Sequence, residues 1–456
     1  MIRFLLAVSA VCVVFLCTGV SFADEQLTYR APTKLANTTS AMETPGFWIS
    51  RHPSPDEVIM TAEAVAEFNK SVRTKVKQVK DFTQLPETFS GEELLENLRT
   101  GFDEIKAKGY FVESGEPASE MFFQDRASDM NMTSVPSVIE PQFGFVLRYT
   151  AQRFLPTREG LYEQPGDFDF DYLQNSSLEI ATPVIILHKS FDSQWFYTFG
   201  PVSDGWVKAD DIALCALKDI EEFLSAEKWA VAVNPKVDLF SDAKLISFEQ
   251  HVQMGARFPK EKKQETAGVT AVRVPTRRSD GRFAFGTAYI DKSDISDGFL
   301  PYTARTIYKQ AFKLLNEPYG WGGMYGEQDC SRFLQEIFST VGIDLPRDSK
   351  DQSKVGTEIT VFDNLPGPQK PRAEFFPKAV PGVSILTMKG HIMLYLGMID
   401  NRPYAIHAVW AYRESAGDED RVRVINRVAV SDLELGEGSK KGSLMKRLTG
   451  IRIFSK

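Results

Sequence analysis

The 456-residue sequence predicts an α+β fold with a mostly helical N-terminal region, two small β-barrels, and a C-terminal domain of helices followed by an antiparallel sheet. Three observations predict it. Apolar residues recur at helical spacing before residue 137, short β-like runs fill residues 138–302, and both patterns follow one another after residue 303. We therefore expect a leader at 1–23, a helical region at 24–137, barrels at 138–220 and 221–302, and a last domain at 303–456.

The leader has the three parts of a secretory signal. Met1-Ile2-Arg3 is charged, residues 4–20 are apolar, and Ser21-Phe22-Ala23 ends in a small residue, so we expect cleavage after Ala23. The apolar run is short for a membrane span, so we expect no stable membrane insertion after cleavage, with an uncleaved anchor as the alternative. The expected location is periplasmic or secreted.

Cleavage at this point changes the formal net charge from −8 to −9 and leaves two cysteines, Cys215 and Cys330. No basic stripe accompanies this acidic balance, which argues against nucleic acid as a partner. Cys215 lies in an apolar run and is typical of a small buried residue. A free Cys330 in an oxidising compartment is more informative, because an exposed thiol without a function is an oxidation hazard there.

Helices are expected in the N-terminal region over 55–75 and 91–108, so this region forms either a helical domain or an arm wrapped around the others. Strands are expected in the first barrel at 143–149, 183–188, 195–199 and 205–208, and in the second at 230–233, 268–274 and 283–290. The barrels share a Pro-Thr-Arg sequence, at 156–158 and 275–277. It indicates either a duplication or a common turn.

The C-terminal domain is expected to contain helices near 307–315 and 330–341, then strands at 383–388, 391–396, 402–409 and 450–454. A proline-rich stretch between Lys350 and Pro381 is expected to border a site. Cys330 begins the second helix, directly after a glycine-rich loop, with Asp329 in the capping position. A thiol in the first turn of a helix is favoured as the thiolate by the helix dipole.

Two of the five histidines, His391 and His407, lie in short apolar runs downstream of Cys330. Such runs predict neighbouring strands, and a thiolate at a helix start facing imidazoles on an adjacent sheet is the arrangement that a cysteine hydrolase requires. A zinc site built from Cys330, His391 and His407 is a minor alternative, because zinc prefers other spacing and a further ligand. We expect no metal and no cofactor.

Several motifs together resemble the NlpC family of papain-like cell-wall peptidases over residues 303–456. They are Tyr319-x-Trp-Gly-Gly, Asp329-Cys330-Ser331, Leu345-Pro-Arg-Asp-Ser349, Gly390-His391 and Ile406-His407-Ala408. The resemblance implies a papain-like peptidase domain preceded by two bacterial SH3-like barrels and a stabilising N-terminal domain. The sequence departs from the family at Arg332, where glycine is usual, and at Val383, which replaces a common aspartate.

The resemblance also implies roles for seven residues. Cys330 would be the nucleophile, His391 the general base and His407 the residue that orients it. The Tyr319 hydroxyl would join the Cys330 N–H in binding the oxyanion. Asp329, Ser331 and Ser349 would line a pocket for a peptidoglycan stem peptide, a murein tripeptide or tetrapeptide, and Asp329 would either pair with a substrate ammonium or serve only as the helix cap.

The activity implied is hydrolysis of the γ-D-glutamyl to L-diamino-acid bond in stem peptides with a free N-terminal L-alanine. One aromatic residue of the first barrel, among Trp195, Tyr197 and Trp206, is a candidate to close the pocket. Two alternatives remain open. One is a non-catalytic peptidoglycan-binding protein, and the other is an amidase or acyltransferase on the same scaffold.

Overall fold

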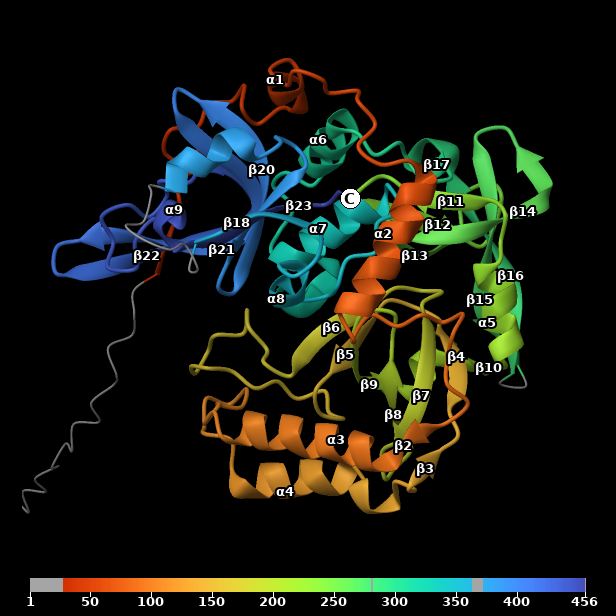
Figure 1. Ribbon diagram of the computed structural model, residues 1–456. Helices are drawn as coiled ribbons and strands as arrows, with labels where there is room; N and C mark the ends of the chain where they lie inside the picture. The colour runs from red at the N-terminus through yellow and green to blue at the C-terminus, as the bar shows by residue number, and fades with distance from the viewer. Residues whose placement is uncertain (1–27, 280–281, 363–371, 456) are drawn as a thin grey trace, which may run out of the picture.

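The computed structural model describes residues 28–279, 282–362 and 372–455 (Figure 1). The expected leader at 1–23 and part of the proline-rich stretch, 363–371, lie outside these residues. The α+β architecture is confirmed, with three large, mostly antiparallel sheets and helices packed around them. Within the described ranges, no helix combines the length and the apolar character needed to cross a membrane.

The C-terminal sheet is antiparallel except for its first pair, β1 and β22, which run parallel. In spatial order its strands are β1 (Thr28–Arg30), β22 (Glu419–Asp432), β21 (Arg402–Ala416), β20 (His391–Ile399), β19 (Ser384–Met388), β23 (Leu448–Ile453) and β18 (Thr357–Val361). The C-terminal part of the chain also contains the short helices η4 (Trp321–Gly326), α8 (Ser349–Gln352), η6 (Arg372–Lys378) and α9 (Leu444–Arg447).

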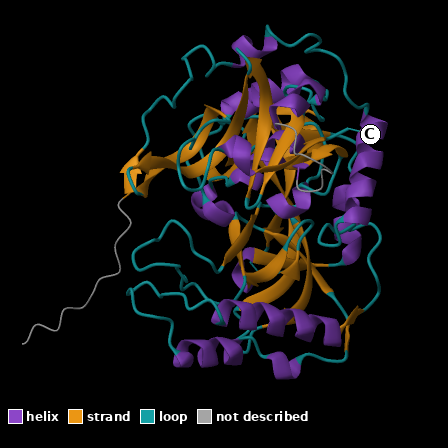
Figure 2. Ribbon diagram, turned by 60° about the vertical axis from the view of Figure 1, so that its left-hand side comes forward, coloured by secondary structure: helices purple, strands orange, loops and turns teal. Residues whose placement is uncertain are grey.

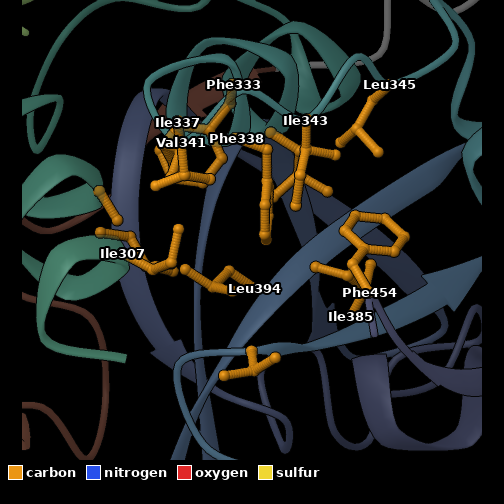
Figure 3. Packing of buried hydrophobic residues seen from close by; sticks show 14 of the residues in the cluster. Ile307, Phe333, Ile337, Phe338, Val341, Ile343, Leu345, Ile385, Leu394 and Phe454 are labelled. Atoms are coloured by element: carbon orange, nitrogen blue, oxygen red, sulfur yellow. The ribbon is translucent and has the colours of Figure 1, made fainter. Parts of the chain in front are cut away.

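Two longer helices, α6 (Ala304–Lys313) and α7 (Cys330–Ser339), share one buried apolar core with this sheet. Figure 3 shows Phe333 and Ile337 of α7 in this core with Ile307 of α6 and Leu394 of β20. All four side chains are completely buried. This packing fixes the start of α7 against the sheet.

The N-terminal region divides between two cores instead of forming its own. Its elements are α1 (Pro45–Ile49), α2 (Ala62–Lys75), β2 (Phe89–Ser90), α3 (Gly91–Lys106), α4 (Glu120–Asp129), η1 (Met132–Ser134) and β3 (Val138–Ile139). Phe68 and Val72 of α2 join the core of the C-terminal domain, whereas Leu98 of α3 and Phe123 of α4 join that of the barrels. Figures 1 and 2 show α3 and α4 together at the end of the molecule below the first barrel.

The helix expected over 55–75 begins later, at Ala62. Thr61 has an extended backbone, and its hydroxyl accepts a hydrogen bond from the N–H of Ala64, which makes Thr61 the N-cap. The second expected helix, at 91–108, is α3 and ends two residues earlier than expected.

Each barrel is built from one seven-stranded sheet. The first has the order β10 (Ile212–Cys215), β4 (Gln142–Val146), β7 (Pro183–Lys189), β8 (Trp195–Phe199), β9 (Asp204–Lys208), β5 (Thr150–Arg153) and β6 (Gln174–Leu178). The second has the order β13 (Phe248–Gln253), β12 (Lys236–Phe240), β16 (Phe283–Asp291), β15 (Val269–Arg277), β14 (Arg257–Thr266), β11 (Trp229–Ala232) and β17 (Ile295–Asp297). The single-turn helices η2 (Ala209–Asp211) and η3 (Lys292–Asp294) and the helix α5 (Leu217–Leu224) complete this part.

The repeated Pro-Thr-Arg sequence does not mark equivalent places in the two barrels. Residues 156–158 lie in the loop after β5, whereas residues 275–277 lie inside β15. The repeat therefore gives no support to a duplication. The barrels nonetheless share a core, in which Phe145 stacks on Phe283 with ring centroids 5.5 Å apart.

Candidate active site

Cys330 is the first residue of α7, as expected, and follows the glycine-rich loop. The carboxylate of Asp329 caps the helix by accepting hydrogen bonds from the backbone N–H groups of Ser331 and Arg332. Cys330 is 7% exposed, and the backbone of Ile392 favours its thiolate form, which opposes the rise in the pKa of the thiol. Because Ile392 follows His391 on β20, the thiol lies beside the strand that carries the first histidine.

His391, His407 and Ser431 form a line of hydrogen bonds across β20, β21 and β22. His391 Nε2 lies 2.7 Å from His407 Nδ1, and His407 Nε2 lies 3.0 Å from Ser431 Oγ. His407 and Ser431 are completely buried, whereas His391 is partly exposed. Since Nε2 of His391 is engaged with His407, Nδ1 is the nitrogen left to exchange a proton with another group.

Burial keeps the thiol and the imidazole uncharged. It raises the pKa of Cys330 to about 12, and the charge of Asp329 adds to this rise. Burial also lowers the pKa of His391 to about 4, with a further contribution from Arg447. The resting pair is therefore a thiol and a neutral imidazole, which corrects the expectation of a thiolate, because desolvation outweighs the helix dipole here.

Asp329 is the centre of a closed polar network. Arg347 donates to both of its carboxylate oxygens, at 2.6 Å from Nη2 to Oδ2 and 3.2 Å from Nη1 to Oδ1. The hydroxyl of Ser331 donates to Oδ1 at 2.9 Å, and the N–H of Gly322 donates to Oδ2 at 3.2 Å. Although burial opposes it, the guanidinium of Arg347 and these hydrogen bonds hold the pKa of Asp329 below its usual value.

The three residues expected to line a substrate pocket therefore differ in what they can offer. Asp329 is already ion-paired, and the Ser331 hydroxyl also accepts a hydrogen bond from Arg347 at 2.9 Å. Asp329 thus acts as the helix cap, one of the two roles expected for it. Ser349 begins α8 and is partly exposed, and its hydroxyl has no hydrogen-bond partner in the described part of the chain.

The loop before Cys330 is held against the first barrel. Gly322 and Gly323 have positive φ angles of 60° and 85°, and a Cβ at either position would collide with atoms of that barrel. Gln174 of β6 donates a hydrogen bond to the Gly322 carbonyl at 3.1 Å, and the Tyr149 hydroxyl donates to the Gly323 carbonyl. Trp321 donates to the Asp171 carbonyl at 3.1 Å, so the barrel fixes the approach to the nucleophile.

Aromatic residues from both domains meet beside this loop. The ring of Phe170, from the first barrel, lies 5.4 Å from that of Trp321 and 5.2 Å from that of Trp410. Tyr319 lies 6.3 Å from Phe170, and burial together with the nearby Cys330 raises the pKa of Tyr319 well above its usual value. Its hydroxyl is therefore a neutral hydrogen-bond donor.

The three aromatic residues proposed to close the pocket are instead buried within the first barrel. Trp206 is completely buried, and Trp195 and Tyr197 are 8% and 6% exposed. Each lies in the barrel core because it sits on the inner side of a short strand. The aromatic residue of the first barrel that lies beside the loop before Cys330 is Phe170. It precedes β6 in a loop rich in acidic residues, so a search for aromatic residues in strands does not find it.

Sequence reasoning also missed Arg347 and Ser431. Arg347 lies within the Leu345-Pro-Arg-Asp-Ser349 motif, but it is far from Asp329 in the sequence, so no local pattern links the two residues. Ser431 is the penultimate residue of β22, a strand that the expected sheet did not include, although its charged and apolar residues alternate. Only its position across the sheet from His407 connects it to the site.

Comparison with known proteins agrees with this geometry. Residues 316–370 match the family model described as the NlpC/P60 family, and residues 161–208 match an SH3 domain of the SH3b1 type. A solved NlpC/P60 endopeptidase from Photobacterium damselae subsp. piscicida has the same fold, with a TM-score of 0.73 and 20% identity over 94% of this chain and 99% of that one.

Two curated proteins of Bacillus subtilis are similar over shorter stretches. The gamma-D-glutamyl-L-lysine dipeptidyl-peptidase is 35% identical over 85 residues, which cover 18% of this chain and 29% of that protein. The bifunctional muramidase/DL-endopeptidase CwlT is 32% identical over 94 residues, which cover 20% of this chain and 26% of that protein. The chain thus spans less than a third of each relative, and on these matches together it carries an NlpC/P60 family domain preceded by an SH3 domain of the SH3b1 type.

Proposed function

We propose that this protein is a cell-wall cysteine endopeptidase that hydrolyses the γ-D-glutamyl to L-diamino-acid bond of peptidoglycan stem peptides. The observation that carries the proposal is the placement of Cys330 at the start of α7, beside the strand that presents the hydrogen-bonded pair of His391 and His407. A relative named for the γ-D-glutamyl-L-lysine bond supports the choice of bond. The matched family favours action outside the cytoplasm, and so does the leader expected at 1–23.

The reaction starts from an uncharged pair. As the Cys330 sulfur attacks the carbonyl carbon, its proton passes to Nδ1 of His391, which becomes an imidazolium. The N–H of Cys330 and the hydroxyl of Tyr319 stabilise the oxyanion. The imidazolium then protonates the leaving amine as the C–N bond breaks and becomes a neutral imidazole again. This imidazole accepts a proton from the water that attacks the thioester, and it returns that proton to the Cys330 sulfur as the C–S bond breaks.

His407 keeps His391 in the orientation that this reaction needs. Nδ1 of His407 accepts the hydrogen bond from the N–H at Nε2 of His391, which fixes the orientation of the His391 ring. The lone pair on Nδ1 of His391 therefore faces away from His407. Burial and the neighbouring His391 lower the pKa of His407 well below its usual value, so His407 stays neutral and does not repel the imidazolium.

The activity is tested by mass spectrometry of defined stem peptides incubated with the full chain. Cys330→Ala is expected to abolish cleavage, because the nucleophile is lost. Cys215→Ala is the matched control, since Cys215 is the other cysteine in the described part of the chain and lies in β10 of the first barrel. Undiminished binding of peptidoglycan without hydrolysis of any peptide would favour the non-catalytic alternative, and release of a different product would favour the amidase.

The preference for a free N-terminal L-alanine is the finer part of the proposal. It is tested with peptides whose alanine is free or N-acetylated, and the free form is expected to be cleaved faster. Because Arg347 already neutralises Asp329, Asp329→Asn is expected to reduce cleavage of both forms. A loss confined to the free-amine peptide would instead show that Asp329 meets the substrate ammonium directly.

A further inference from the structure

We infer that Ser431 is a positioning residue of the proposed hydrolytic site, whose hydroxyl accepts the N–H of His407 and thereby leaves His391 able to act as a base. The inference rests on the proposed function. It is carried by the line of hydrogen bonds from His391 through His407 to Ser431, with lengths of 2.7 and 3.0 Å, and by the complete burial of its last two members.

The sheet places Ser431 on the same face as His407. In the antiparallel pairing of β21 with β22, His407 lies opposite Ala429 and Ala405 lies opposite Ser431. Ser431 is therefore the diagonal neighbour of His407, two residues from the directly opposed position. This contact is set by strand register, which neither side chain can alter by rotation alone.

Two proton arrangements satisfy the contact between the histidines. In the first, His391 donates from Nε2 to His407 Nδ1, and His407 carries its own proton on Nε2. In the second, His407 donates from Nδ1 to His391, whose proton then occupies Nδ1. Only the first arrangement leaves Nδ1 of His391 free to accept the proton of Cys330.

The first arrangement requires an acceptor for the N–H on His407 Nε2. Ser431 Oγ is the acceptor within reach, and His407 is completely buried. Without this oxygen the N–H at His407 Nε2 would be a buried donor without a partner. Burying that donor costs more free energy than burying an unprotonated Nε2 with its lone pair. Removal of the hydroxyl thus shifts the pair toward the second arrangement and takes away the base.

The same arrangement is required after the proton has moved. The imidazolium of His391 has protons on both nitrogens, so His407 must again accept at Nδ1 and donate from Nε2. Arg447 and Asp329 are the charged groups that act on His391, and His391 is the titratable group that acts on His407. Arg447 disfavours the imidazolium and Asp329 favours it, so Ser431 adds stabilisation that does not depend on a net charge.

The test compares Ser431→Ala, Ser431→Thr and Ser384→Ala in the full chain. Ser384 is a matched control, because it is a completely buried serine in the same sheet and its hydroxyl bonds to the Val380 N–H at 2.8 Å. Ser431→Ala is expected to lower kcat/KM on a defined stem peptide about tenfold through kcat, with KM unchanged. Ser431→Thr keeps the hydroxyl and is expected to restore most of the rate, and Ser384→Ala to leave the rate near wild type.

Two readouts do not depend on turnover. The rate of Cys330 alkylation by iodoacetamide at neutral pH is expected to fall about tenfold in Ser431→Ala and not in Ser384→Ala. Nitrogen-15 NMR of the imidazoles is expected to show the proton of His407 on Nε2 in the wild type and on Nδ1 in Ser431→Ala.

An unchanged proton position in Ser431→Ala, or an equal loss of alkylation rate in Ser384→Ala, would overturn the inference. Failure of the wild type to cleave any stem peptide would count against the proposed function alone, because the alkylation and NMR results would still report on Ser431.

Discussion

The two barrels hold the C-terminal domain in different ways. The first barrel contacts it through enclosed polar side chains: Arg332 of α7 pairs with Glu179 at 3.0 Å, each 14% exposed, and the buried Arg347 donates to Ser176 at 3.0 Å. The ion pairs of the second barrel are more exposed, although its Met254 is buried in the apolar core of the C-terminal domain. Lys236, 37% exposed, bonds Glu327 at 2.5 Å.

This difference shows which barrel shapes the site. Contacts from the first barrel end on the loop before Cys330, on α7 itself and on the arginine that neutralises Asp329. The ion pairs of the second barrel end on Glu327, in the loop before Cys330, and on Asp344, in the segment after α7. A buried polar contact is costly to break and an exposed one is not, so the first barrel is expected to control both stability and activity.

The largest effect is expected from Arg347→Met. Asp329 would remain buried with no cation beside it, which costs about 3–5 kcal/mol of the free energy of unfolding. Its uncompensated charge would also raise the pKa of Cys330 further and slow turnover. Chemical denaturation followed by fluorescence measures the loss.

A control for this change is Arg305→Met, since Arg305 pairs with the exposed Asp56. It is expected to leave the denaturation midpoint nearly unchanged. Similar losses in both variants would remove the distinction between enclosed and exposed contacts.

A smaller effect is expected from pH at the contact between α7 and the first barrel. Burial raises the pKa of Glu336 to about 8 and that of Glu179 to about 7, against the pull of Arg332. Above about pH 4.5 these carboxyl groups have lost their protons in the unfolded state but still hold them in the folded state. Their contribution to the free energy of unfolding therefore falls as the pH rises toward 8.

Glu336→Gln is expected to flatten this decline, because one of the two titrating groups is removed. Thermal unfolding at pH 5.5 and 8.5 makes the comparison. A decline as steep as that of the wild type would show that another group is responsible.

The smallest effect is expected from Lys236→Ala in the second barrel. The ion pairs of Lys236 with Glu327 and Glu317 are open to solvent on the lysine side, so their loss should cost less than about 1 kcal/mol. Activity on a stem peptide is expected to stay near wild type. A loss as large as that of Arg347→Met would place the second barrel in control as well.

Much of the framework was predictable because it depends on local pattern. The α+β fold is confirmed, and the strands at 183–188 and 195–199 correspond closely to β7 and β8. The start of α7 at Cys330 and the contact between His391 and His407 are as expected. The roles of these three residues stay predictions, as do the domain boundaries.

The remainder depends on which surfaces meet after folding. No local pattern shows that α2 completes the core of a domain more than two hundred residues away, or that Arg347 reaches back to Asp329. β6 has few of the apolar residues that mark a strand. β22 does alternate charged with apolar residues, which is a strand pattern, but the expected sheet did not include it. The charge state of Cys330 was missed for the same reason, since burial is a property of the assembled fold.

The pairing of β1 with β22 has a consequence for any attempt to produce the C-terminal domain alone. β1 lies along the margin of the sheet, with Tyr29 beside Arg423 and Arg30 beside Val424. A fragment starting at residue 303 would lack this cover, exposing a row of backbone donors and acceptors to other molecules. It would also lack α2, so such a fragment is expected to self-associate in solution, and experiments on this protein call for the intact polypeptide.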